Sequence, residues 1–122
     1  MSSFSSTIAV HGGRSCDPGH GSLVTPIVQS TTYVQDEVGI NKGHAYSRVS
    51  NPTVTELERR LGALESAAPA VCFGTGLAAE TALFLATLRA GDHVVCGDAI
   101  YGGTVRLVRQ LLSELGISGT FV

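Results

Sequence analysis

Short apolar runs alternate with longer helical patterns in the second half of the chain, and this alternation restricts the fold more than any other feature of the sequence. Residues 70–73 (AVCF), 93–96 (HVVC) and 119–122 (GTFV) read as short buried strands. Between them, the sequence predicts an almost wholly apolar helix at residues 77–88 and a second helix with one apolar face, made of Val108, Leu111, Leu112 and Leu115. Strands that alternate with helices predict a parallel sheet with both faces covered, so we expect an α/β fold.

Another amphipathic helix is predicted just before this region. Its apolar positions recur at helical spacing and its charged positions take the other faces: Val54, Leu57, Leu61 and Leu64 against Glu56, Glu58, Arg59 and Arg60. Asn51 is a good N-cap, with Pro52 at the first helical position. Thr53 with Glu56 offers a rival capping box. The helix is therefore expected to begin near residue 51.

The first 50 residues differ in composition from the rest of the chain. They are rich in Ser, Thr, Gly and Pro, with only short apolar pieces such as Leu23 to Val28. We expect an extended, irregular N-terminal arm at residues 1–50 and the start of an α/β domain at residues 51–122. An irregular stretch of this length is unusual unless it is functional or packs on a partner.

The last residues, Phe121 and Val122, are apolar and would leave an open sheet edge and an uncovered face. This ending favours a fragment whose α/β domain is incomplete. The alternative is a small three-stranded domain in which the last strand is a protected edge.

Composition and charge exclude several functional classes. A net charge of −2, with Lys and Arg residues scattered without runs, predicts no nucleic-acid surface. No stretch approaches the roughly 20 apolar residues that span a bilayer, and no signal peptide begins the chain, so a cytoplasmic protein without a membrane anchor is expected.

The cysteines are odd in number and far apart, at Cys16, Cys72 and Cys96, which predicts reduced thiols. With the histidines they show no metal-ligand spacing, so no metal site is expected.

The stretch FGTGLAAE, residues 73–80, predicts an anion site. A strand runs through a glycine-rich turn into a helix N-terminus, where free N–H groups and the positive end of the helix dipole face outward. Gly74 and Gly76 would let a phosphate approach the amides of Gly76 and Leu77, with the Thr75 hydroxyl nearby. A purely structural turn remains the alternative, because the full P-loop and dinucleotide patterns are absent.

Two further positions have side chains suited to a ligand. Tyr101 follows the strand at residues 93–96, at the edge where open α/β sheets bind ligands, and its ring can lie flat against a planar ring. Tyr46 and Arg48 precede Asn51-Pro52, and in an extended segment both point to one side. Their phenol and guanidinium suit a phosphate. The alternatives are a loop-packing Tyr101 and a partly buried Tyr46 beside a surface Arg48.

The strings YSRVSNPT, GTGLAAE and DAIYGGT occur here in an order and at separations that resemble the N-terminal part of the Cys/Met metabolism family of pyridoxal-phosphate enzymes. This family includes cystathionine γ-synthase, the cystathionine lyases and methionine γ-lyase, and the chain looks most like the γ-synthases. The resemblance implies that residues 51–122 form the first βαβαβ part of a fold-type-I, aspartate-aminotransferase-like large domain. It also implies pyridoxal 5'-phosphate as the cofactor.

The resemblance assigns roles to the site residues. The amides of Gly76 and Leu77, next to Thr75, would hold the cofactor phosphate, and Tyr101 would stack on the pyridine ring. Tyr46 and Arg48 would reach the phosphate held by a neighbouring subunit. A homo-oligomer, a dimer of dimers with composite active sites, is therefore implied.

Two features of the sequence depart from the family pattern. Members more often have Ser-Gly-Met where this chain has Thr75-Gly76-Leu77. The only lysine, Lys42, lies in the arm and is not the Schiff-base lysine, which is expected downstream together with the partner of the pyridine nitrogen and the arginine for the substrate carboxylate. The 122 residues alone are therefore expected to be inactive, with no catalytic residue of their own.

The resemblance implies a transferase or lyase of sulfur amino acid metabolism. The expected reaction is γ-replacement or γ-elimination on a homoserine ester or cystathionine, as in cystathionine γ-synthase. Cystathionine γ-lyase, cystathionine β-lyase and O-acylhomoserine sulfhydrylase remain alternatives, while Gly103 weighs against methionine γ-lyase. A different class of function also stays open, in which the chain is a truncated or split subunit that only binds a partner chain.

Overall fold

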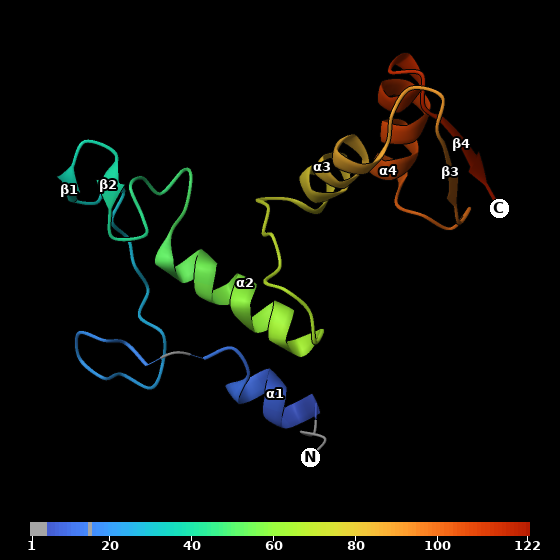
Figure 1. The fold of residues 1–122 in the computed structure, drawn as a ribbon. Helices are drawn as coiled ribbons and strands as arrows, with labels where there is room; N and C mark the ends of the chain where they lie inside the picture. The colour runs from blue at the N-terminus through green and yellow to red at the C-terminus, as the bar shows by residue number, and fades with distance from the viewer. Residues whose placement is uncertain (1–4, 15) are drawn as a thin grey trace. The chain divides into compact units, whose positions relative to one another are not determined.

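The computed structural model describes residues 5–14 and 16–122, and the chain divides into two compact units, residues 1–72 and 73–122 (Figure 1). Residues 1–4 and 15 of the predicted arm lie outside the described residues. Among the described helices, none has the length and apolar character needed to cross a membrane.

The described part of the first unit contains two helices and a small hairpin. Helix α1 (Ser5–His11) packs against helix α2 (Pro52–Leu64). Between them in sequence, strands β1 (Gln35–Glu37) and β2 (Ile40–Asn41) pair in antiparallel fashion. The predicted irregular arm therefore contains regular elements. The domain boundary predicted at residue 50 stays a prediction.

Helix α2 begins as the sequence predicts. Asn51 is the N-cap, its side chain accepts a hydrogen bond from the Thr53 N–H at 2.9 Å, and Pro52 is the first helical residue. The rival capping box does not form, because the Thr53 hydroxyl instead accepts a hydrogen bond from the N–H of Val28 at 2.9 Å. The start of the helix is thus joined directly to the arm.

The burial of α2 differs from the predicted pattern. The apolar positions Val54, Leu57, Leu61 and Leu64 are between 40% and 49% exposed, whereas Glu56 is only 5% exposed. Glu56 is buried because it accepts hydrogen bonds at 3.2 Å from Thr25 and Arg60. Gly62 is also buried, since the chain returns across it and an added β-carbon would lie 2.8 Å from the Cα of Pro69.

Residues 70–73 form no strand, contrary to the sequence prediction. The N–H of Ala70 donates to the Glu58 carbonyl at 2.9 Å, and the N–H of Cys72 donates to the Glu58 carboxylate at 2.9 Å. The donors that a strand would give to a neighbouring strand are therefore bound to residues of α2.

The second unit contains the predicted alternation of helix and parallel strand. Its elements are α3 (Gly76–Thr87), β3 (His93–Cys96), α4 (Gly102–Arg106), the π-helical segment η1 (Leu107–Leu112) and β4 (Ser118–Phe121). Strands β3 and β4 pair in parallel from His93↔Ser118 to Cys96↔Phe121, joined by α4 and η1 (Figure 1). The parallel, helix-linked pairing is as predicted. The sheet has two strands and not three, however, and most residues of both strands are at least partly exposed where the sequence predicted buried strands.

The core of this unit lies between η1 and the two strands. Its buried residues are Cys96, Leu107, Val108, Leu112 and Ile117. Two of the four predicted core positions on this helix, Leu111 and Leu115, are instead 45% and 46% exposed. In a π-helix the hydrogen bonds reach one residue further along the chain than in an α-helix, so the turn is wider than the assumed 3.6 residues. The buried face accordingly holds Leu107, Val108 and Leu112, while Leu111 turns outward.

Candidate functional site

The N-terminus of α3 presents two backbone donors that nothing in the described chain binds. Thr75 caps the helix: its hydroxyl oxygen accepts from the Ala78 N–H at 3.1 Å and its carbonyl accepts from the Ala79 N–H at 3.2 Å. The N–H groups of Gly76 and Leu77 have no hydrogen-bond partner among the described residues. These are the two amides to which the sequence assigned a phosphate, at the positive end of a helix of 12 residues.

The space around the glycines at this turn is open. An added β-carbon at Gly74 or Gly76 would meet nothing within 4 Å among the described residues, and neither glycine has a positive φ. Neither backbone conformation nor packing within this unit therefore requires glycine at these positions. Close approach of a bound anion is a sufficient reason for both, so the turn fits a phosphate group.

Tyr101 lies in the same unit, at the N-cap of α4. It is 69% exposed, so its ring does not pack its loop into the core. The ring lies over Gly103, where an added β-carbon would come within 3.0 Å of Cδ1 and 3.2 Å of Cζ. One side of the ring is thus supported by the backbone, and the exposed remainder suits stacking on a planar ligand.

A partly buried hydrogen bond connects α4, which begins directly after Tyr101, to α3. Thr104 is 1% exposed, and its hydroxyl donates to the carboxylate of Glu80 at 2.6 Å. Sequence reasoning missed this pair, because the two residues lie on different helices and neither belongs to a ligand motif. The bond fixes α4 against the helix that carries the free amides.

The first unit holds the other predicted pair. The guanidinium carbon of Arg48 lies 4.9 Å from the centroid of the Tyr46 ring. Both side chains are exposed, and within the described residues neither the guanidinium nor the phenol hydroxyl makes a hydrogen bond. The two side chains therefore meet, and their polar atoms are available to a ligand. Thr75, Gly76, Leu77 and Tyr101 belong to the second unit.

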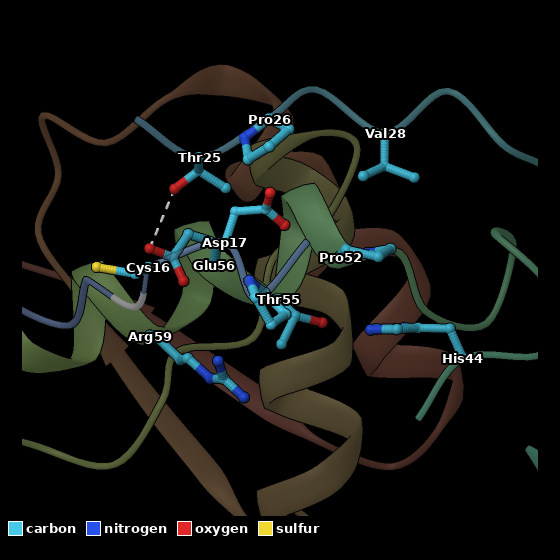
Figure 2. A pocket seen from close by; sticks show the side chains of 11 residues that line it. Cys16, Asp17, Thr25, Pro26, Val28, His44, Pro52, Thr55, Glu56 and Arg59 are labelled. Carbon is cyan, nitrogen blue, oxygen red and sulfur yellow. Dashed lines mark hydrogen bonds between the residues drawn. The ribbon is translucent and has the colours of Figure 1, made fainter. Parts of the chain in front are cut away.

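A cavity of about 230 Å³ in the first unit lies between the arm and α2 (Figure 2). The residues around it include charged, apolar and thiol side chains: Cys16, Asp17, Pro18, Thr25, Pro26, Val28, His44, Pro52, Thr55, Glu56 and Arg59. They come from separated stretches of the chain, so no local pattern in the sequence identifies them.

Hydrogen bonds at this cavity join the arm to α2. Thr25 donates to Glu56 at 3.2 Å and accepts from Arg60 at 3.0 Å, and Arg60 also donates to Glu56 at 3.2 Å. The backbone N–H of His20 donates to Asp17 at 2.8 Å and lowers the pKa of that carboxyl below its ordinary value. Among the described residues no group of His, Cys, Asp and Glu is arranged to hold a metal ion.

Comparison with known proteins identifies the family. The profile described as "Cys/Met metabolism PLP-dependent enzyme" matches residues 6–122. The chain is 47% identical over 116 residues to a probable cystathionine gamma-synthase of Herpetosiphon aurantiacus, covering 95% of this chain and 36% of that protein. It is 43% identical over 116 residues to the cystathionine gamma-lyase of Bacillus subtilis, covering 95% of this chain and 30% of that protein.

Solved structures agree with this assignment. The structure of metB from Corynebacterium glutamicum superposes with a TM-score of 0.90 at 40% identity, covering 99% of this chain and 32% of that one. The cystathionine gamma-lyase of Lactobacillus plantarum complexed with L-serine gives a TM-score of 0.85 at 35% identity, covering 98% and 31%. The chain thus spans about a third of the length of these relatives, and the predicted fold class, the N-terminal part of a fold-type-I domain, is confirmed. The chain belongs to the Cys/Met metabolism family of enzymes that depend on pyridoxal phosphate.

Proposed function

We propose that this chain supplies the phosphate cradle and the ring-stacking face of an enzyme that acts on sulfur-containing amino acids. The proposed reaction is γ-replacement or γ-elimination on a homoserine ester or cystathionine. The pair of free amides at the start of α3, beside two glycines in open space, is the observation that carries the proposal. Relatives at similar identity include a gamma-synthase, a gamma-lyase and a beta-lyase, so the proposal covers this group of activities.

The start of α3 would bind the cofactor phosphate. Gly76 and Leu77 donate their N–H groups, and the helix dipole favours the negative charge. The Thr75 oxygen already accepts from Ala78, but its proton has no acceptor among the described residues. The Thr75 hydroxyl can therefore donate a third hydrogen bond to the phosphate.

Tyr101 would cover one face of the pyridine ring. When bound, pyridoxal phosphate supplies an electron sink for the substrate carbon next to the amino group. The stacked ring of Tyr101 keeps water from that face and holds the cofactor plane in one orientation. Glu80 and Thr104 keep the Tyr101 loop against α3.

Tyr46 and Arg48 would bind the phosphate held by a neighbouring subunit in a homo-oligomer, which we take to be a dimer of dimers. Two observations support this role. Both side chains are exposed with hydrogen-bond donors that bind nothing among the described residues, and both belong to the unit that does not contain α3.

Lys42 is paired with Asp36 at 3.5 Å and its side chain is 75% exposed, so we assign it no catalytic role. The lysine that moves protons would come from outside these 122 residues.

The free cysteines suit a reducing compartment, and we infer a cytoplasmic location.

A proline at Gly76 tests the cradle in the intact enzyme. Proline is tolerated at the first helical position and removes only the N–H, and the extended backbone of Thr75 (φ −147, ψ 152) suits a residue before proline. Loss of one charge-assisted hydrogen bond of about 1.5–3 kcal/mol should weaken cofactor binding roughly tenfold to a hundredfold.

The matched control is Gly76→Ala, which adds a β-carbon as proline does but keeps the amide, so the difference between the two variants reports the N–H group alone. Cofactor affinity is measured by titrating the apoenzyme and following absorbance and fluorescence. Equal affinities for the proline and alanine variants would show that the amide of Gly76 does not bind the phosphate.

A further inference from the structure

Ser47, the residue between Tyr46 and Arg48, makes three hydrogen bonds. Its hydroxyl donates to the Ser30 carbonyl at 2.9 Å and accepts from the Asn51 side-chain amide at 2.8 Å. Its backbone N–H donates to the Thr31 carbonyl at 2.8 Å. Both hydrogen-bonding roles of the hydroxyl are therefore used.

Asn51 connects this residue to the start of α2. Its side-chain oxygen accepts from the Thr53 N–H at 2.9 Å. Its amide nitrogen lies within hydrogen-bond distance of three acceptors, the Ser47 hydroxyl at 2.8 Å, the Val28 carbonyl at 3.1 Å and the Tyr33 hydroxyl at 3.3 Å. One end of the Asn51 amide contacts a carbonyl, which can only accept, and the other end contacts an N–H group, which can only donate. These two contacts identify the nitrogen and the oxygen of the side chain. One side chain thus caps the helix and anchors the turn.

The backbone is extended up to Tyr46 and then turns, because the Tyr46 carbonyl accepts from the N–H groups of Val49 and Ser50 at 2.9 and 3.1 Å. The prediction of an extended segment at residues 46–48 is therefore wrong. Tyr46 forms an antiparallel bridge with Thr32, flanked by hydrogen bonds from Tyr33 to Ala45 and from Ser47 to Thr31. In this turn the Ser47 hydroxyl contacts Ser30 of the arm and Asn51, while the guanidinium carbon of Arg48 lies 4.9 Å from the centroid of the Tyr46 ring. The hydrogen bonds of Ser47 therefore restrain the backbone on which both exposed side chains are carried.

We propose that Ser47 and Asn51 are positioning residues that hold Tyr46 and Arg48 in the geometry that binds a cofactor phosphate. The proposal rests on the phosphate-binding role proposed above for that pair. A restrained pair loses less conformational entropy on binding than a mobile one, so the restraint raises affinity without touching the ligand. The hydroxyl is needed because only a group that both donates and accepts can join Asn51 to Ser30.

The test is a set of variants of the intact enzyme: Ser47→Ala, Ser47→Thr, Arg48→Ala and Ser47→Ala/Arg48→Ala. Cofactor dissociation constants are measured by titrating each apoenzyme. Ser47→Ala should weaken cofactor binding about threefold to tenfold, the scale of one neutral hydrogen bond, and Ser47→Thr should restore it. The loss in the double variant should be smaller than the sum of the two single losses, because Ser47 acts partly through Arg48 and partly through Tyr46, which the double variant retains.

A second variant keeps the test valid if Ser47→Ala folds poorly. Asn51→Asp keeps the oxygen that caps α2 and loses the amide that donates to Ser47, Val28 and Tyr33. Helix content measured by circular dichroism should stay unchanged while cofactor affinity falls as in Ser47→Ala. The Tyr46–Arg48 separation in a crystal structure of this variant should also become variable between subunits.

The outcomes separate the two proposals. If Arg48→Ala binds the cofactor normally, the phosphate role of the arm is wrong and the positioning role falls with it. If Arg48→Ala weakens binding while Ser47→Ala and Asn51→Asp do not, only the positioning role is overturned. Additive losses in the double variant would also overturn it, since they would show that Ser47 acts independently of Arg48.

Discussion

The hydroxyl of Thr104 donates a hydrogen bond of 2.6 Å to the carboxylate of Glu80, and this partly buried contact joins α4 to α3. Removing the Thr104 hydroxyl takes one hydrogen bond away from the carboxylate of Glu80, which is partly buried. Thr104→Val keeps the shape of the side chain and should lower the free energy of unfolding by about 1–3 kcal/mol. Chemical denaturation of the intact enzyme measures this loss.

Thr104→Ser is the matched control for that prediction. It keeps the hydroxyl and loses a methyl group, so its unfolding free energy should fall less than that of Thr104→Val. A larger loss for serine than for valine would mean that packing of the methyl group, and not the hydrogen bond to Glu80, stabilises this contact.

Gly103 leaves room for the ring of Tyr101. A β-carbon at position 103 would lie 3.0 Å from Cδ1 of that ring, so Gly103→Ala should displace the ring and weaken cofactor binding. The neighbouring Gly102 offers a control, because a β-carbon there meets nothing within 4 Å among the described residues. Titration of both apoenzymes with pyridoxal phosphate should show lower affinity for Gly103→Ala only.

The effect of Gly103→Ala should also depend on Tyr101. In a Tyr101→Ala background no ring remains to be displaced, so the added methyl group should cause no further loss of affinity. Equal losses in the two backgrounds would show that Gly103 acts on something other than the tyrosine.

The pKa of Asp17 is lowered chiefly by the backbone N–H of His20, with the His20 side chain contributing less. A lowered pKa means that the ionised carboxylate stabilises the folded state above the unfolded pKa of about 3.9 and that this stabilisation is lost as pH falls through the folded pKa. His20→Ala keeps the backbone donor and should leave the pKa low. His20→Pro removes the donor and should raise it towards its ordinary value.

Carbon NMR of the Asp17 carboxyl over a pH titration measures these values. The unfolding free energy of the wild type should exceed that of Asp17→Asn above about pH 4, and the difference should shrink as the solution becomes more acidic. A pKa that rises as much in His20→Ala as in His20→Pro would assign the effect to the imidazole instead.

Local signals in the sequence were sufficient for several features of the fold. The cap at Asn51, the helix after the Thr75 turn and a parallel partner for residues 93–96, predicted at 119–122 and found at 118–121, all follow from short patterns. The glycine-rich turn likewise indicated which amides would be free, because an N-terminal helix amide has no partner inside its own helix.

Features that depend on distant residues were missed. Glu56 is buried by Thr25, which lies 31 positions earlier in the sequence, and no helical pattern records that contact. Residues 70–73 have strand-forming side chains, but Glu58 takes their backbone donors. The outward turn of Leu111 follows from a π-helical repeat that an assumed period of 3.6 residues cannot predict.

The proposed exchange of Tyr46 and Arg48 between subunits predicts complementation in mixed dimers. An Arg48→Ala subunit would be impaired only in what it gives to its neighbour, whereas a subunit without the catalytic lysine would be impaired only in its own site. In a mixed dimer both defects fall on the same site, and the other site is intact. Mixing two poorly active parents should therefore restore up to about half of the wild-type activity per mixed dimer, by counting sites in a two-fold symmetric pair.

Activity is measured after co-expression of the two variants with different affinity tags and isolation of dimers that carry both. Mixing each variant with itself is the control and should restore nothing. The geometry behind the prediction is that the guanidinium of Arg48 has no hydrogen-bond partner among the described residues and lies outside the unit that carries the free amides of α3. Isolated mixed dimers that remain as inactive as their parents would mean that Arg48 binds the phosphate of its own chain's cofactor, and the composite site would have to be abandoned.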